Sequence, residues 1–186
     1  MPAHFAFWPA RLPHSITIPA TSLWQNMAVS AMRYPDRAAT VFFGTVLTWA
    51  QMKQAAERLA ARLQALGVGK GDRVLLDMQN TPQLIVAHFA ILRADAVVVP
   101  VNPMNKTEEL QHYISDSDAR VAITTGEIAP ELAAASDALP AGSGLAHLIV
   151  AQYTDGFDAG VQGDDAPPAQ WRDWLLTQYP LPALAG

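Results

Sequence analysis

The sequence predicts an α/β fold: a mostly parallel sheet with helices on both faces, and a small hairpin near its start. Two observations predict it. Short apolar runs alternate along the chain with longer segments of helical period, which is the pattern of β-α-β units. One such unit is complete within residues 67–103, where a strand, a helix and a second strand follow one another with turn residues between them. A right-handed crossover is expected to connect the two parallel strands.

Composition excludes several classes of protein. The 186 residues are 51% hydrophobic and 16% charged with a formal net charge of −5, so we expect a packed core and no nucleic-acid partner. The absence of cysteine excludes disulfides, thiolate catalysis and Cys-based zinc sites. No window reaches the roughly 18 continuous apolar residues of a membrane helix, and the N-terminus lacks the layout of a signal peptide. We therefore expect a cytoplasmic protein with no transmembrane segment.

Residues 1–20 are predicted to form an extended arm. They contain four prolines and several bulky aromatic residues, and they show no helical period. We interpret the arm as a strap packed on its own domain, with a partner contact as the alternative. An amphipathic helix is expected next, capped by Ser22 and ending near Tyr34, and then a hairpin that turns at Gly44.

The segment from Thr48 to Gly67 is the strongest helix prediction. Thr48 and Gln51 have the spacing of a capping box, and apolar residues then recur at helical intervals. Glycine is typical just past the end of a helix, so Gly67 is expected to end this one. The charged residues on the opposite face are interpreted as solvated surface.

The central unit carries its own start and stop residues. An apolar run at residues 74–76 predicts a buried strand, and Thr81 before Pro82 predicts a capped helix. That helix is apolar almost all round, so we expect it to be buried, with His88 as a core imidazole. The run at residues 96–99 is typical of a parallel strand covered on both faces, closed by Pro100.

The same alternation continues to the end of the sheet. Thr107 is expected to cap a further helix. A strand at 120–124, a helix within 126–139 and a strand at 145–151 are predicted after it. A linker at 153–169 and a short helix around Trp171 and Trp174 are predicted to follow. The expected organisation is an arm (1–20), an α/β subdomain (21–152), and a linker with a short helix that leads to a missing remainder (153–186).

Two glycine-containing segments can be compared with phosphate loops. The turn at residues 67–72 contains Lys70, but it precedes a strand and no Ser or Thr follows the lysine, whereas phosphate loops precede a helix. Residues 124–126 stand at a strand end, but no lysine follows and Glu127 would repel phosphate, so we interpret them as a helix cap. The five histidines lack metal-ligand spacing, and no serine lies in a G-x-S-x-G elbow. We expect no catalytic or metal-ligating residue in this chain.

In combination, several segments resemble the opening motifs of the adenylate-forming superfamily. The matching stretches are LTWAQM (47–52), GVGKGDRV (67–74), NTP (80–82) and ILRADAVVVPVNP (91–103). Asn102-Pro103 followed by residues 108–110 is most similar to the fatty-acid and aromatic-acid CoA ligases. The similarity extends from about Leu23 to Leu132.

The resemblance implies a ligase that works in two steps. A carboxylate, here a fatty or other carboxylic acid, attacks the α-phosphate of ATP to make an acyl-adenylate, and the CoA thiol then displaces AMP. Such chemistry depends on positioning and charge stabilisation. In the family, the phosphate loop, the magnesium ligand and the catalytic lysine lie in later segments. We therefore expect the N-terminal subdomain of a longer enzyme that uses ATP, Mg and CoA, with none of them bound by this chain alone and no acyl-adenylate formed by it.

Two departures from the family pattern concern the CoA ligase comparison. Relatives usually have glycine where Asp95 stands, and an aspartate tolerates a positive φ there better than most residues do. Some CoA ligases place an arginine facing the CoA phosphate directly after Asn-Pro, where this chain has Met104. Lys106 is the candidate to supply that charge, against an ordinary exposed lysine as the alternative. Two other classes stay open, a non-catalytic assembly module and a small nucleotide binder, as does a homodimer.

Overall fold

The structure is a computed structural model that describes residues 3–185. Its helices are α1 (Leu23–Arg33), α2 (Trp49–Ala65), α3 (Pro82–Arg93), α4 (Thr107–Ser117), α5 (Ala129–Asp137) and α6 (Ala169–Leu176), with short 3-10 helices η1 (Ala3–Phe7) and η2 (Gly163–Asp165). Its strands are β1 (Ala38–Phe42), β2 (Thr45–Thr48), β3 (Arg73–Asp77), β4 (Val97–Val101), β5 (Val121–Thr125) and β6 (His147–Ala151). None of the described helices is long and apolar enough to cross a membrane.

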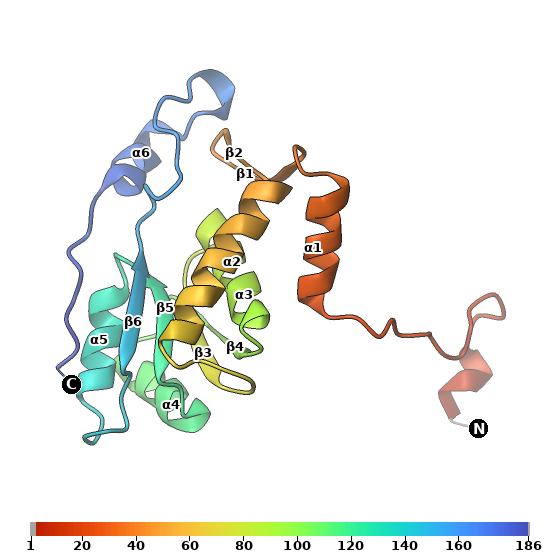
Figure 1. The fold of residues 1–186 in the computed structure, drawn as a ribbon, viewed down its shortest axis with the longest axis horizontal. Helices are drawn as coiled ribbons and strands as arrows, with labels where there is room; N and C mark the ends of the chain where they lie inside the picture. Colours follow the sequence, from red (N-terminus) through yellow and green to blue (C-terminus); the bar gives the residue numbers. More distant parts are fainter. Residues whose placement is uncertain (1–2, 186) are drawn as a thin grey trace.

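The predicted fold class is confirmed. Four strands form a parallel sheet in the order β4-β3-β5-β6, and β1 and β2 form a separate antiparallel hairpin (Figure 1). Phe43 and Gly44 both have positive φ in the hairpin turn, as a tight two-residue turn requires. The order places β4 and β6 at the two edges and β3 and β5 in the middle.

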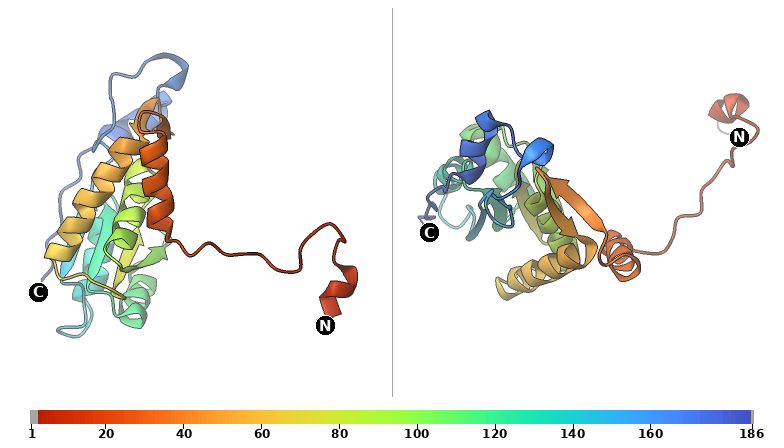
Figure 2. Two further views of the ribbon diagram at one scale, coloured as in Figure 1. Left: turned by 45° about the vertical axis from the view of Figure 1, so that its right-hand side comes forward. Right: turned by 90° about the horizontal axis from the view of Figure 1, so that it is seen from above.

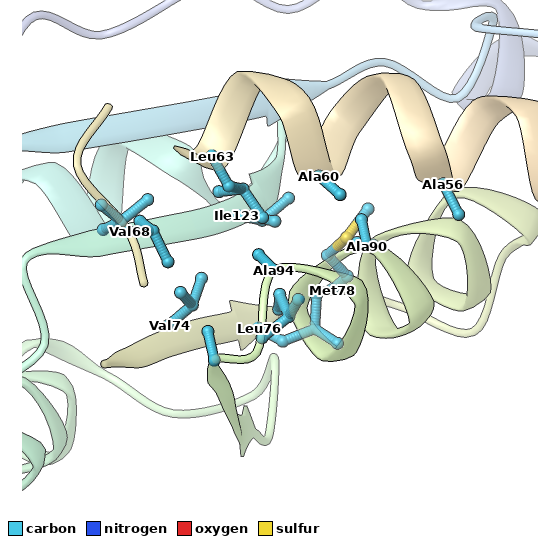
Figure 3. Close-up of a cluster of buried hydrophobic side chains, with 14 of the residues drawn as sticks. Ala56, Ala60, Leu63, Val68, Val74, Leu76, Met78, Ala90, Ala94 and Ile123 are labelled. Carbon is cyan, nitrogen blue, oxygen red and sulfur yellow. The ribbon is translucent and has the colours of Figure 1, made fainter. Parts of the chain in front are cut away.

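Alternate residues of the central strands face two separate cores. Val74 and Leu76 of β3 pack with α2 and α3, whereas Leu75 between them packs with α4 and α5. Figure 3 shows the first core, where side chains of α2, α3 and the two central strands meet between the layers. Successive residues of the central strands point to opposite faces of the sheet, and the residues on both faces are apolar. Helices therefore cover both faces, as the sequence predicts.

The α2 helix has the predicted ends. The Thr48 hydroxyl accepts a hydrogen bond from the Gln51 N–H, and the Gln51 side chain accepts one from the Thr48 N–H. At the other end, the N–H of Val68 donates to the Leu63 carbonyl at 3.0 Å, with Gly67 at φ +88° between them. Such a Schellman turn uses the conformational freedom of glycine to satisfy the last helical carbonyls.

Two burial predictions for the central unit are wrong. The β4 strand lies at a sheet edge, with Val97 46% exposed, so it is not covered on both faces, and Pro100 lies inside the strand. Proline has no N–H to donate, and an edge strand tolerates this loss. The α3 helix is buried along one side only, at Ala87, Ala90 and Ile91, and His88 is half-buried beside the Phe89 ring.

The arm at the start of the chain does not pack on its own domain. Residues 8–20 are exposed and extend away from α1, as both views in Figure 2 show. Within the arm, the Phe5 ring stacks on the His14 ring with centroids 4.2 Å apart, and the short helix η1 stands where no helix was predicted. The prediction of a packed strap is wrong because these aromatic residues contact one another instead of the sheet.

Candidate functional site

The carboxyl end of the two central strands is where the chain can present a site. The connection from β3 leads to β4 on one side, and the next strand, β5, lies on the other side of β3. In open α/β sheets, ligands bind beside the carboxyl ends of strands at such a reversal of strand order. The residues that end β3 and β5, Asp77 and Thr125, and those that follow them are therefore the first candidates.

Asp77 and Thr124 form a buried polar pair at this end of the sheet. They are register partners on β3 and β5, so their side chains share the face that α4 and α5 cover. Asp77 is 2% exposed and Thr124 is fully buried, and neither Asp77 Oδ1 nor Thr124 Oγ1 has a hydrogen-bond partner. Burial raises the pKa of Asp77 from 3.8 to about 7, because a carboxylate loses its hydration there.

Glu127 is the centre of a second polar cluster, just past the end of β5. Its two carboxylate oxygens accept hydrogen bonds from the Tyr153 hydroxyl and from the Trp174 indole N–H. The centroids of the Tyr153 and Trp174 rings lie 4.1 Å apart. Burial, and after it the hydrogen bond to Glu127, raises the pKa of the Tyr153 hydroxyl well above its usual value. We call Glu127, Tyr153 and Trp174 the latch, because they join α6 to the sheet.

A side chain after β6 holds the segment that follows α6. The Gln152 amide donates to the Tyr179 carbonyl at 3.0 Å and accepts from the Tyr179 N–H at 3.1 Å. Gly126 lies beneath this contact, where an added Cβ would come within 2.7 Å of both Gln152 and Tyr179. The glycine therefore permits the close approach of three segments at the carboxyl end.

Lys106 lies at the same end of the sheet and is exposed. It is the N-cap residue of α4, where its N–H donates to Glu109 Oε2 at 3.0 Å. Thr107 does not cap the helix as predicted, because its hydroxyl and N–H both bond to Glu131 of α5. The hydrogen bond from Thr107, and then the charge of Lys106, lower the pKa of Glu131. A phosphate at Lys106 would therefore have carboxylates nearby.

The two glycine segments do not form a phosphate site. The turn at residues 67–72 lies at the amino end of β3, where the Gly69 N–H bonds to Asp72 Oδ2 at 2.8 Å, so the predicted plain turn is confirmed. The interpretation of residues 124–126 as a cap is wrong, since α5 begins at Ala129 and its N-cap, Ile128, makes no side-chain cap.

The described residues also do not fit a magnesium ion or the phosphates of ATP. No group of three or more histidine or acidic side chains among residues 3–185 could hold a metal. The negatively charged latch residue Glu127 follows β5 at the position where a phosphate-binding helix would start.

Comparison with known proteins assigns a family. The model of a family described as AMP-binding enzyme matches residues 27–179. The chain belongs to the AMP-binding enzyme family. Its curated relatives include a long-chain-fatty-acid–CoA ligase from Bacillus subtilis, 35% identical over 68% of this chain and 22% of the relative. One with the same name from Escherichia coli O6:H1 is 36% identical over 80% of this chain and 26% of the relative. This AMP-binding chain thus spans about a quarter of their length.

Solved structures agree with this assignment. The N-terminal domain of FACL13 from Mycobacterium tuberculosis, in an inhibitor-bound crystal, matches with a TM-score of 0.63 and 33% identity over 69% of this chain and 33% of that one. A second crystal form of that domain matches with a TM-score of 0.64 and 30% identity over 78% of this chain and 40% of that one. The family resemblance and the predicted N-terminal location in an acyl-CoA ligase fold are confirmed.

Sequence reasoning missed Asp77 and the latch in this AMP-binding chain. Asp77 could have been noticed as an acid that ends an apolar strand without a turn residue beside it. Tyr153 and Trp174 stand 21 positions apart around a Gly- and Pro-rich loop, and only the folded chain brings both to Glu127. Asp95 was identified correctly, since its φ is +60°.

Proposed function

We propose that this chain is the N-terminal part of a longer ATP-dependent acid–thiol ligase that makes an acyl-adenylate and then an acyl-CoA thioester. The observation that carries the proposal is the family match over residues 27–179 together with relatives named long-chain-fatty-acid–CoA ligase, of which the chain spans 22–26%. A fatty acid is the proposed substrate, with ATP, Mg and CoA as cofactors of the longer protein and the cytoplasm as its location.

A different thiol acceptor has specific support. One relative, 36% identical over 76% of this chain, is named salicyl-AMP ligase / salicyl-S-ArCP synthetase. Its name gives a salicyl group as the activated acid and ArCP, an aryl carrier protein, as the thiol acceptor. The same first half-reaction with a carrier protein in place of CoA is therefore our second candidate, and an acceptor assay of the longer protein separates the two.

We predict that the 186-residue chain alone catalyses no acid-dependent exchange between pyrophosphate and ATP. The physical reason is that the carboxyl end of its sheet presents the carboxylate of Glu127, and that residues 3–185 include no group of three or more histidine or acidic side chains able to hold a metal ion that would steady a departing pyrophosphate. The measurement is label exchange with a panel of fatty and aromatic acids, with the longer protein as positive control. Turnover by the 186-residue chain would contradict the prediction, whereas no turnover by the longer protein with any acid would end the ligase proposal and favour an assembly module. Tight ATP binding by the short chain without turnover would instead favour a small nucleotide binder.

We further propose that Lys106 binds a phosphate of CoA. Replacing Lys106 with alanine in the longer protein is expected to raise the KM for CoA about 5- to 10-fold, as loss of one exposed charge-assisted contact does. The exchange rate for the adenylation step should stay unchanged. The matched control is Lys70→Ala, because Lys70 is exposed at the opposite end of the sheet. Equal KM values for CoA in both variants and the unsubstituted protein would show that Lys106 is an ordinary surface lysine.

A further inference from the structure

The arm at the start of the chain leaves its large apolar side chains in solvent. Phe7 is 91% exposed, and Leu12, Ile16 and Ile18 are each more than half exposed. Among residues 3–185, no hydrogen bond joins residues 3–18 to the chain beyond residue 21. An apolar segment that its own domain leaves uncovered indicates a binding surface for a protein or a membrane.

Aromatic contacts give the first part of the arm a fixed local shape. The Trp8 ring stands edge-on to the Phe5 ring with centroids 5.8 Å apart, and the Trp8 indole N–H donates to the Leu12 carbonyl at 3.2 Å. Phe7 stays outside this cluster, since it is almost fully exposed. A tryptophan combines an apolar ring with a polar N–H, and such side chains favour the boundary between water and lipid.

The sequence around the arm carries no negative charge. Residues 1–35 contain no aspartate or glutamate, and Arg11 and Arg33 give them a formal charge of +2. Because the whole chain has a formal charge of −5, the residues after 35 carry −7. Basic and apolar side chains without acidic ones are the composition that binds a surface of anionic lipids.

The length of the arm keeps the acidic body of the protein away from such a surface. An anionic bilayer repels the body, but at physiological salt this repulsion is screened beyond about 8 Å. Residues 15–21 form no helix or strand and carry the aromatic cluster clear of α1 (Figure 2). An extended segment of this length spans up to about 25 Å. The arm therefore reaches a bilayer while the body stays outside the range of its charge.

We propose that residues 3–20 are an interfacial anchor for a bilayer that contains anionic phospholipid. Phe7, Trp8 and Leu12 insert at the level of the headgroups, and Arg11 pairs with lipid phosphates. The anchor lies in the interface and does not span the bilayer, because most of its backbone is in no helix or strand and its N–H and C=O groups require water. The inference goes beyond the ligase proposal and does not depend on it.

The test is sedimentation of the 186-residue chain with sucrose-loaded vesicles, made of phosphatidylcholine alone or of phosphatidylcholine mixed with phosphatidylglycerol. The chain should bind the mixed vesicles, and Arg11→Gln should lower its partition coefficient about fivefold, the usual effect of one basic residue at an anionic surface. Phe7→Ser should lower it about tenfold, because the ring no longer leaves water. The matched control is Met104→Ser, which removes a 78% exposed apolar side chain outside the arm and should leave the coefficient unchanged.

Absence of binding to the mixed vesicles would overturn the anchor, and so would equal binding to both kinds of vesicle or unchanged binding by either arm variant. A dimer that forms without lipid and that Phe7→Ser dissociates, seen by sedimentation velocity, would assign the arm to a second copy of the chain instead. Circular dichroism checks that these exposed substitutions leave the fold intact. Vesicle binding is measured without ATP or a carboxylic acid, so its outcome is independent of the exchange assay for the ligase.

Discussion

The chain is expected to lose about 4 kcal/mol of folding stability between pH 4 and pH 7 through Asp77 alone. Its pKa is 3.8 in an unfolded chain and about 7 in the folded one. In this pH window the folded state keeps the proton that the unfolded state has released, so the free energy of unfolding falls by about 1.4 kcal/mol per pH unit. The stabilisation of the folded state by protonated Asp77 is fully present below pH 3.8, is lost as the pH rises to about 7, and stays absent above pH 7.

The measurement is urea unfolding of the chain and of Asp77→Asn at a series of pH values. Asparagine is neutral throughout and nearly isosteric, so the difference between the two proteins isolates Asp77. The free energy of unfolding of the Asn variant minus that of the unsubstituted chain should rise by up to about 4 kcal/mol from pH 4 to pH 8. At pH 8 the Asn variant should therefore be the more stable protein. Glu131, whose pKa is lowered, acts in the opposite direction and cancels in this difference. A difference that does not change with pH would show that Asp77 is solvated in the folded state.

Local chemistry explains why the order and kind of the elements could be predicted from the sequence. Thr48 with Gln51, and Thr81 before Pro82, mark helix starts through contacts within four residues. Gly67 and Asp118 stand at helix ends in the left-handed region, as expected of glycine and of a short polar side chain. Such contacts join residues that are close in the sequence, and the family motifs contain several of these capping residues.

The features that we did not predict from the sequence depend on which strands become neighbours in the sheet. The Val-Val-Val run of β4 has the composition of a central strand, and only the order β4-β3-β5-β6 puts it at an edge. Pro100 was the available clue, and we interpreted it as the end of the strand. In the candidate site, Asp77 meets Thr124 because β3 and β5 pair across 47 positions of sequence. No local pattern predicts that pairing or its register.

Removal of the Tyr153 side chain is expected to release the segment after β6 from the sheet. Tyr153 is 1% exposed, packs on Trp174 and donates to Glu127. Tyr153→Ala should cost about 3–5 kcal/mol, the usual range for truncation of a buried aromatic residue. Tyr153→Phe keeps the ring and loses the hydrogen bond to Glu127 together with the longer 3.5 Å contact with the Thr125 hydroxyl, which should cost about 1.5–3 kcal/mol. Urea unfolding measures both values.

Limited proteolysis distinguishes local release from general destabilisation. Trypsin can cleave after Arg172, which lies within α6 beside the latch. If Tyr153 holds α6 on the sheet, Tyr153→Ala should speed this cleavage more than cleavage after Arg62 in the long α2 helix. The matched control is Tyr34→Ala, since Tyr34 is a 56% exposed tyrosine that ends α1 and is not part of the latch, so its loss should change stability by less than about 1 kcal/mol. Equal acceleration at both arginines in Tyr153→Ala would mean that the side chain stabilises the whole subdomain, and that the latch has no separate function in positioning α6 and Tyr179.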